Sequence, residues 1–120
     1  MRNVIVTGGS RGLGLAIGET LARAGYSVIA IARSETAEFR AAAARAASQG
    51  NGALGFVAFD LSEIDGIAGL VSSLRGDYGP LYGLVNNAGL GTEGVLANMH
   101  NTRIEQLVRL NTISPILLTK

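Results

Sequence analysis

The sequence predicts a doubly wound α/β domain built on a parallel sheet of four strands. Four short runs of Val, Ile, Leu and Ala are almost uninterrupted, which is typical of strands buried on both faces of a sheet. Segments with helical spacing separate these runs, and a glycine-rich turn at 7–14 follows the first. Right-handed crossovers between parallel strands then predict the strand order 3-2-1-4, in which the first and fourth strands are neighbours.

The elements are assigned in order along the chain. Strands are predicted at 4–6, 27–32, 54–59 and 81–85, and helices at 13–24, 34–49, 62–74 and 102–120. In the first helix Leu13, Ile17 and Leu21 recur at four-residue steps, so we expect them to face one way. The third helix has Ser62 as its predicted N-cap, with Asp65 at the capping-box position.

Composition narrows the classes of function. The 120 residues allow one domain, and 48% hydrophobic residues with 17 glycines suit a chain that buries both faces of a sheet. The net charge of +1 comes from scattered residues, so we expect no nucleic-acid or membrane partner. The absence of cysteine excludes disulfides, and the single histidine, His100, argues against a metal site. No apolar run approaches the ~20 residues that span a bilayer, so we expect a cytoplasmic protein.

The turn at 7–14 joins a strand to a helix, which is the geometry that holds a dinucleotide pyrophosphate on backbone amides. Gly8 permits the tight turn, Gly12 lets the backbone approach a phosphate, and Gly14 lets the helix pack closely on the strand. The helix N-terminus favours the negative charge. The alternative is a glycine-rich loop that serves turn geometry only.

The glycine spacing in Thr7-Gly8-Gly9-Ser10-Arg11-Gly12-Leu13-Gly14 resembles the TGxxxGxG signature of the classical short-chain dehydrogenase/reductase family. Asn86-Asn87-Ala88-Gly89 resembles that family's NNAG motif, and Asp60-Leu61 at the end of the third strand supports the match. The predicted strand order brings the glycine turn and the NNAG motif to the same crevice. The resemblance covers essentially the whole chain and implies a Rossmann-like dinucleotide-binding domain.

The resemblance also implies a role for each motif. Residues 8–14 would carry the phosphates, Asp60 and Leu61 would border the adenine, and residues 87–89 would line the ribose side. Two alternatives stay open, with Asp60 as a cap for the following helix and Asn86 as a side chain that bonds neighbouring strands. With the arginines discussed next, the predicted cofactor-binding residues are Gly8, Ser10, Arg11, Gly12, Leu13, Gly14, Arg33, Asp60, Leu61, Asn87, Ala88 and Gly89.

Charge predicts which nicotinamide cofactor is preferred. An acid at the end of the second strand reads the ribose 2′-hydroxyl of NAD, whereas a cation there reads the 2′-phosphate of NADP. Here the strand ends Ile31-Ala32-Arg33-Ser34, and Arg11 in the glycine turn would supply a second guanidinium. Two arginines that border one ribose predict NADP(H) rather than NAD. Solvated surface arginines are the alternative interpretation.

Asn111 is the one catalytic candidate. In the resembled family an Asn of this helix holds, through its backbone carbonyl, a water that contacts the active-site lysine. Pro115 has no amide hydrogen, so the Asn111 carbonyl would lose its usual helical donor and be left for water. The alternative is that Pro115 only kinks the helix.

The catalytic Tyr-x-x-x-Lys pair of the resembled family is absent, because Tyr26, Tyr78 and Tyr82 all lack a lysine four positions onward. The family's catalytic serine likewise belongs to a segment that would lie beyond Lys120. We therefore expect a cofactor-binding domain at 1–120 that is truncated in the helix after the fourth strand and is inactive alone. The expected function of the parent protein is NADP(H)-dependent carbonyl reduction or alcohol oxidation by hydride transfer.

Residues 86–99 resemble the 3-oxoacyl-[acyl-carrier-protein] reductase branch of the family. This resemblance implies a small-molecule carbonyl, alcohol or acyl-thioester substrate, and a parent protein that is a homotetramer or homodimer. The alternative function is a non-catalytic module that binds nucleotide or pairs with other subunits. An epimerase-like extended branch is disfavoured by the glycine spacing and by the missing acid after the second strand.

Overall fold

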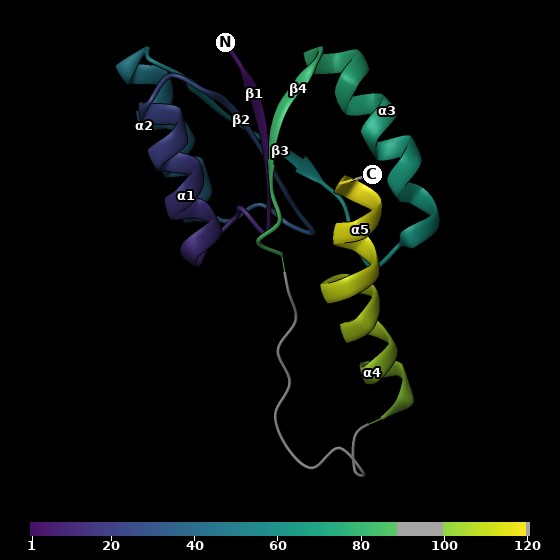
Figure 1. Cartoon of the computed structure of the whole chain (residues 1–120). Coiled ribbons are helices and arrows are strands. Elements are labelled where there is room, and N and C mark those ends of the chain that lie inside the picture. Colours follow the sequence, from purple (N-terminus) through teal and green to yellow (C-terminus); the bar gives the residue numbers. More distant parts are fainter. Residues whose placement is uncertain (89–99, 120) are drawn as a thin grey trace.

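The structure is a computed structural model that describes residues 1–88 and 100–119. Four parallel strands form one sheet in the order β3-β2-β1-β4, which confirms the predicted topology (Figure 1). The strands are β1 (Asn3–Thr7), β2 (Ser27–Ala32), β3 (Ala53–Ala58) and β4 (Leu81–Val85). Because all four run the same way, the loops that carry the predicted motifs leave the sheet at one edge, which we call the carboxyl edge.

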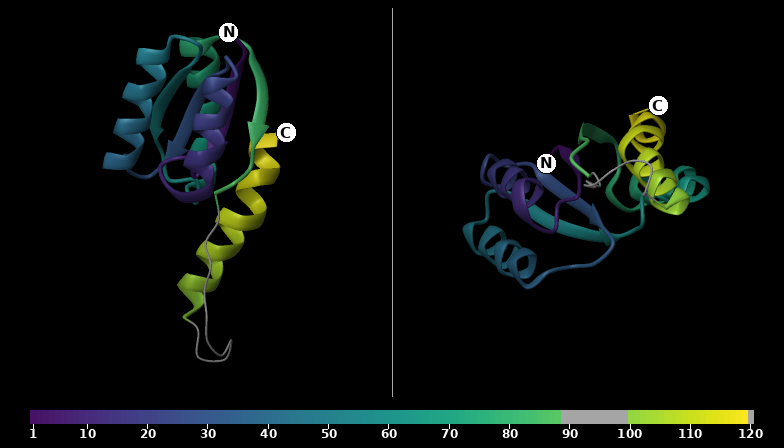
Figure 2. Two further views of the ribbon diagram at one scale, coloured as in Figure 1. Left: turned by 90° about the vertical axis from the view of Figure 1, so that its left-hand side faces the viewer. Right: turned by 90° about the horizontal axis from the view of Figure 1, so that it is seen from below.

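Helices cover both faces of this sheet. They are α1 (Gly12–Arg23), α2 (Ala37–Gln49), α3 (Ile67–Tyr78), α4 (Asn101–Val108) and α5 (Ser114–Thr119), with a 3-10 turn η1 (Ile64–Gly66) before α3 and a π-helical segment η3 (Arg109–Ile113) between α4 and α5. α1 and α2 lie on one face, and α3 and α5 lie on the other (Figure 2). The helix predicted at 102–120 is therefore three consecutive segments with a change of helical pitch in the middle.

Each face of the sheet has its own apolar core, because alternate residues of a strand point to opposite sides. The core beneath α1 and α2 contains Val4, Val6, Val28, Ala30 and Leu54 from the strands and Leu15, Ala22, Phe39 and Ala42 from the helices. The core on the other face contains Ile5, Ile29 and Ile31 from the strands with Leu61, Leu70 and Leu74. Burial on both faces is the reason that the runs at residues 4–6 in β1 and 28–32 in β2 are apolar without interruption.

The prediction that Leu13, Ile17 and Leu21 face one way holds for Ile17 and Leu21, which pack against the core, and fails for Leu13. Leu13 is 70% exposed in the first turn of α1, whereas the buried residues of this helix are Gly14, Leu15, Gly18 and Ala22. A Cβ at Gly18 would lie 3.3 Å from the Leu54 side chain, so the glycine allows α1 to pack closely on the sheet. The three-residue and four-residue steps from Leu15 through Gly18 to Ala22 define the buried face, and they were obscured because one member has no side chain.

α2 begins at Ala37, later than the predicted 34, because Thr36 caps it. The backbone of Thr36 is extended, and its hydroxyl oxygen accepts a hydrogen bond from the amide of Phe39 over 3.1 Å. A Ser, Thr, Asp or Asn in this position satisfies one of the free amides of the first turn. The helix ends at Gln49, followed by Gly50 with a φ of 74°.

The prediction of Ser62 as the N-cap of the third helix is wrong. Ser62 instead donates two hydrogen bonds to the Asp60 carboxylate, from its amide over 3.0 Å and from its hydroxyl over 2.7 Å. Asp60 thus closes the turn after β3, and the chain passes through η1 before α3 begins. α3 continues to Tyr78, beyond the predicted end at residue 74, and stops where Gly79 adopts a φ of 89°.

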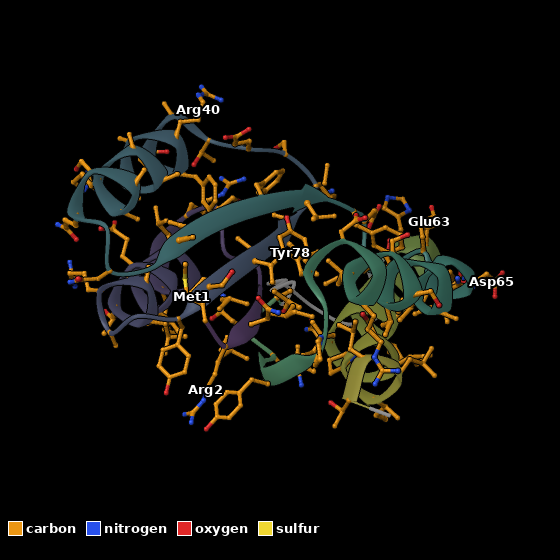
Figure 3. The ribbon with its side chains drawn as sticks, turned by 90° about the horizontal axis from the view of Figure 1, so that it is seen from above. Met1, Arg2, Arg40, Glu63, Asp65 and Tyr78 are labelled. Atoms are coloured by element: carbon orange, nitrogen blue, oxygen red, sulfur yellow. The ribbon has the colours of Figure 1, made fainter. Side chains whose placement is uncertain are left out.

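The three tyrosines gather at the opposite edge, where the strands begin. The rings of Tyr26 and Tyr82 stack with centroids 6.0 Å apart, and the Arg2 guanidinium lies 4.7 Å from the centroid of the Tyr82 ring. Asn3 donates its side-chain amide to the carbonyl of Tyr78 over 2.7 Å. Figure 3 looks onto this edge, with Arg2 and Tyr78 labelled, and we call it the amino edge.

Candidate functional site

A cleft of about 580 Å³ opens at the carboxyl edge of the sheet. Its lining comes from the ends of β1, β2, β3 and β4, so residues from distant parts of the sequence meet there. The predicted cofactor-binding residues that line it are Gly8, Ser10, Arg11, Arg33, Asp60, Leu61, Asn87 and Ala88. Of the other predicted residues, Gly12, Leu13 and Gly14 lie in the first turn of α1 outside this lining, and Gly89 lies outside the described residues.

The glycine turn brings the N-terminus of α1 to the cleft. Gly12 has a φ of 58°, and a Cβ there would meet no atom within 4 Å, so the space beside this backbone is open. Arg11 is the N-cap residue but makes no side-chain capping bond, and the first turn carries no acidic residue. The amides of this turn therefore lack a capping carboxylate or hydroxyl, and the positive end of the helix dipole favours an anion.

Gly14 is required for close approach, but to a different neighbour from the predicted one. A Cβ at Gly14 would lie 2.2 Å from the carbonyl oxygen of Gly8 and 2.5 Å from the side-chain amide of Asn87. Gly14 therefore packs against the turn and the end of β4, and Gly18 provides the helix-to-strand packing that was expected of Gly14.

Thr7 joins the glycine turn to the end of β4. Its side chain is 2% exposed, and its hydroxyl oxygen accepts from the amides of Asn87, over 3.0 Å, and Ala88, over 2.9 Å. The same hydroxyl lies 3.3 Å from the carbonyl of Val85, to which it donates, and the Asn87 side-chain amide donates to Gly8 over 3.3 Å. No role for Thr7 was predicted from the sequence. The signal that could have revealed it is a hydroxyl residue at the end of a buried apolar strand.

Asp60 and Arg33 supply charge to the side of the cleft formed by β2 and β3. The Ser62 hydroxyl that bonds Asp60 lowers the pKa of this carboxyl; burial opposes the shift, and the Ser62 amide and the charge of Arg33 add to it. The carboxylate is thus held ionised at neutral pH. The cleft is also lined by Ser34, Phe59 and Ser62, which were not predicted as binding residues.

Arg11 and Arg33 both line the cleft and both are exposed. Ala32, the last residue of β2, lines it as well and has no side-chain acceptor for a ribose hydroxyl. The lining therefore presents two guanidinium groups, and its described acidic side chain is Asp60, whose carboxylate is already bonded to Ser62.

Asn111 lies in the π-helical segment η3, away from the lining of the cleft. The amide of Ser114 donates to the carbonyl of Arg109, a step of five residues that shifts the bonding pattern by one relative to an α-helix. Asn111 is exposed and is not without an interaction partner. The expectation that Pro115 leaves the Asn111 carbonyl for water assumed α-helical hydrogen bonding. The structure has a π turn here instead.

Asn86 docks α5 against the end of β4. Its side-chain amide donates to the hydroxyl of Thr119 over 3.1 Å, and that hydroxyl donates to the carbonyl of Pro115 over 2.7 Å. The interpretation of Asn86 as a side chain that bonds neighbouring strands is therefore corrected, because its side-chain amide bonds a helix on the sheet face. Within residues 1–88 and 100–119 there is no cluster of three potential metal ligands and no helix long and apolar enough to cross a membrane.

The fold and the cleft at the switch point between β1 and β4 place this chain among the doubly wound α/β proteins that bind ligands at the carboxyl ends of their strands. The sequence matches the short chain dehydrogenase family over residues 2–120. The chain belongs to this family, as its glycine spacing and Asn-Asn-Ala-Gly motif predicted.

Individual relatives agree with this assignment. The 3-oxoacyl-[acyl-carrier-protein] reductase FabG of Escherichia coli (strain K12) is 34% identical over 117 residues, which cover 97% of this chain and 46% of that protein. A metagenomic short-chain oxidoreductase in complex with NADP has a TM-score of 0.88 at 34% identity, covering 98% of this chain and 52% of that one. A short-chain dehydrogenase from Sphingobium yanoikuyae in complex with NADPH has a TM-score of 0.84 at 30% identity, covering 99% and 46%. The chain spans less than half the length of the first curated relatives that it matches.

Proposed function

We propose that the cleft binds NADP(H) and that the chain is the cofactor-binding part of an oxidoreductase that reduces carbonyls or oxidises alcohols. The observation that carries this proposal is the meeting of the open glycine turn, Arg11 and Arg33 in one cleft at the carboxyl edge. Solved relatives bound to NADP and NADPH, at 34% and 30% identity, support the choice of cofactor.

Different residues of the cleft would contact different parts of the cofactor. The first turn of α1, residues 12–14, would hold the pyrophosphate on its amides, with Ser10 and Gly8 beside it. Arg11 and Arg33 would meet the 2′-phosphate, because a guanidinium pairs bidentately with phosphate oxygens. Asp60 and Leu61 would border the adenine, and Asn87, Ala88 and Gly89 would line the ribose side. When bound, the nicotinamide supplies or accepts the hydride.

Hydride-transfer catalysis in this family needs a tyrosine that acts as a general acid and a lysine four positions onward. No tyrosine among these 120 residues has such a lysine. We infer that the chain binds cofactor without catalysing hydride transfer, and that a parent protein supplies the missing groups. Asn111, in the π-helical segment η3, remains the proposed catalytic helper on the strength of its match to the family position alone. A 3-oxoacyl thioester is the proposed substrate class, supported by the 34% identity with the Escherichia coli reductase. A cytoplasmic homotetramer or homodimer is the proposed form of the parent.

The test is a titration of the purified protein with NADPH and with NADH, followed by nucleotide fluorescence, with circular dichroism on the same sample. Saturable binding with NADPH preferred supports the proposed cofactor. A folded protein that prefers NADH contradicts the assignment of Arg11 and Arg33. A folded protein that binds neither nucleotide contradicts the proposed function.

A subunit-interaction module is the second candidate, favoured by the exposed apolar side chains of the last helices. Val108, Ile113 and Ile116 are 42%, 37% and 62% exposed. Sedimentation equilibrium distinguishes the two candidates, because this module self-associates or joins a longer homologue whether or not nucleotide is present. A monomer at all concentrations, with saturable NADPH binding, excludes it.

A further inference from the structure

Two hydrogen bonds tie the glycine turn to the end of β2 and to the connection between β2 and α2. The amide of Gly8 donates to the carbonyl of Ile31 over 2.7 Å, and the hydroxyl of Thr36 donates to the carbonyl of Ser10. Arg33 lies between Ile31 and Thr36 in the chain, so the two bonds bracket the segment that carries it. Arg11 directly follows Ser10, so the second bond fixes the backbone next to the other arginine of the cleft.

Thr36 holds this position through both functions of its hydroxyl. The oxygen accepts from the amide of Phe39, which is 1% exposed in the core beneath α2, while the hydrogen goes to Ser10. A hydroxyl has one hydrogen and two lone pairs, so a single side chain can cap the helix and bond the turn at once. Thr36 thereby fixes the position of the glycine turn relative to α2, which is itself anchored on the sheet.

We propose that Thr36 is a positioning residue that sets the spacing between the Arg11 and Arg33 backbones, and thereby the preference for NADPH over NADH. This inference rests on the proposed NADP(H) site. Two guanidinium groups bind one phosphate well only when both are held at the right separation. NADH has no 2′-phosphate, so loosening this spacing weakens NADPH binding more than NADH binding.

The test compares three variants of the protein. Thr36→Val keeps the shape of the side chain and removes the hydroxyl, whereas Thr36→Ser keeps the hydroxyl. Ala44→Gly is the matched control, because it destabilises α2 at an exposed position by an amount similar to a lost cap and leaves the turn untouched. The measurements are dissociation constants for NADPH and NADH, and hydrogen–deuterium exchange of residues 8–12 without nucleotide.

For Thr36→Val we expect the ratio of NADH to NADPH dissociation constants to fall by about fivefold, the typical worth of one hydrogen bond. Exchange at residues 8–12 should become faster. Thr36→Ser and Ala44→Gly should keep the wild-type ratio and the wild-type exchange of the turn. A fall in the ratio for Ala44→Gly equal to that for Thr36→Val overturns the inference, because loss of helix stability would then explain both.

The exchange measurement keeps this inference separate from the proposed function. If the wild-type protein shows no preference for NADPH, the cofactor proposal fails, and the proposed preference role of Thr36 fails with it. Faster exchange at residues 8–12 in Thr36→Val then still supports its positioning of the turn, and unchanged exchange overturns that as well. If the wild type prefers NADPH and Thr36→Val retains the full preference, the inference alone fails.

Discussion

The hydroxyl of Thr7, at the end of β1, lies 2.9 Å from the backbone amide of Ala88, which follows β4. The two residues are 81 positions apart in the sequence. This hydrogen bond connects the strand that precedes the glycine turn to the motif that closes the other side of the cleft. Together with the hydrogen bond from the Asn87 side chain to the Gly8 carbonyl, it fixes the relative position of the two halves of the site.

Thr7→Val should lower both stability and nucleotide affinity. The change leaves the amide of Ala88 without its acceptor and the amide of Asn87 with only its second acceptor, the carbonyl of Val85. An unsatisfied buried polar group costs about 1–3 kcal/mol. Urea unfolding measures the free energy of unfolding, and the NADPH titration measures affinity. Thr7→Ser keeps the hydroxyl and is the matched control; if it is as damaging as Thr7→Val, the methyl group and not the hydrogen bond is responsible.

Gly14→Ala should disrupt the site. The new Cβ would lie 2.2 Å from the Gly8 carbonyl oxygen, so the turn must move, at a cost of roughly 1–3 kcal/mol. Thermal unfolding and NADPH titration should both show a loss. Gly69→Ala in α3 is the control, since a Cβ there meets nothing within 4 Å and helix propensity alone should stabilise it by about 0.5–1 kcal/mol. Equal behaviour of the two variants would contradict the packing role of Gly14.

Arg33→Ala and Arg11→Ala should each weaken NADPH by roughly tenfold, the scale of one charge-assisted hydrogen bond, and leave NADH nearly unchanged. The loss should shrink as salt concentration rises, because the arginines are exposed and their charges are screened. Arg75→Ala removes an exposed arginine from the last turn of α3 and serves as the control. A parallel loss of NADH affinity would show that the arginines hold the fold rather than the 2′-phosphate.

Asp60 predicts a pH dependence of stability in the acid range. The pKa of this carboxyl is lowered from its usual 3.8 in the folded protein, so the unfolded chain binds the proton more readily. Its contribution to stability is therefore complete above the usual pKa and is lost as pH falls through the lowered one. Urea unfolding from pH 7 down to pH ~2.5 should show a smaller acid-induced loss for Asp60→Asn than for the wild type. Asp77→Asn, which removes an exposed carboxylate at the end of α3, is the comparison; identical curves for Asp60→Asn and wild type would contradict the linkage.

Much of the fold followed from local patterns. The apolar runs predicted all four strands to within one residue at each end, because strands buried on both faces leave few other interpretations. Helix starts were predicted less well. Ser62 and Thr36 are both plausible caps by residue type, and both make local hydrogen bonds. The Ser62 hydroxyl bonds Asp60, two residues earlier, whereas Thr36 accepts from Phe39, three residues later, and caps α2.

The site residues could be predicted where the geometry requires a particular residue type. They could not be predicted where a side chain bonds backbone groups of a distant segment. Gly8 and Asn87 belong to recognisable spacings, and the structure brings both to the cleft. Thr7 and Thr36 escaped because their partners are carbonyls and amides far along the chain, which leave no pattern in side-chain chemistry. The π segment η3 escaped because the sequence marks the proline and not the shift in bonding that precedes it.

The cluster at the amino edge makes the protein convenient to observe. All three tyrosine residues lie there, at the edge of the sheet opposite to the cleft, and the chain contains no tryptophan. Tyrosine emission therefore reports the integrity of one end of the molecule, while the fluorescence of a bound reduced nucleotide reports the other. One cuvette can thus follow unfolding and ligand occupancy through two separate optical signals, each arising from its own edge of the sheet.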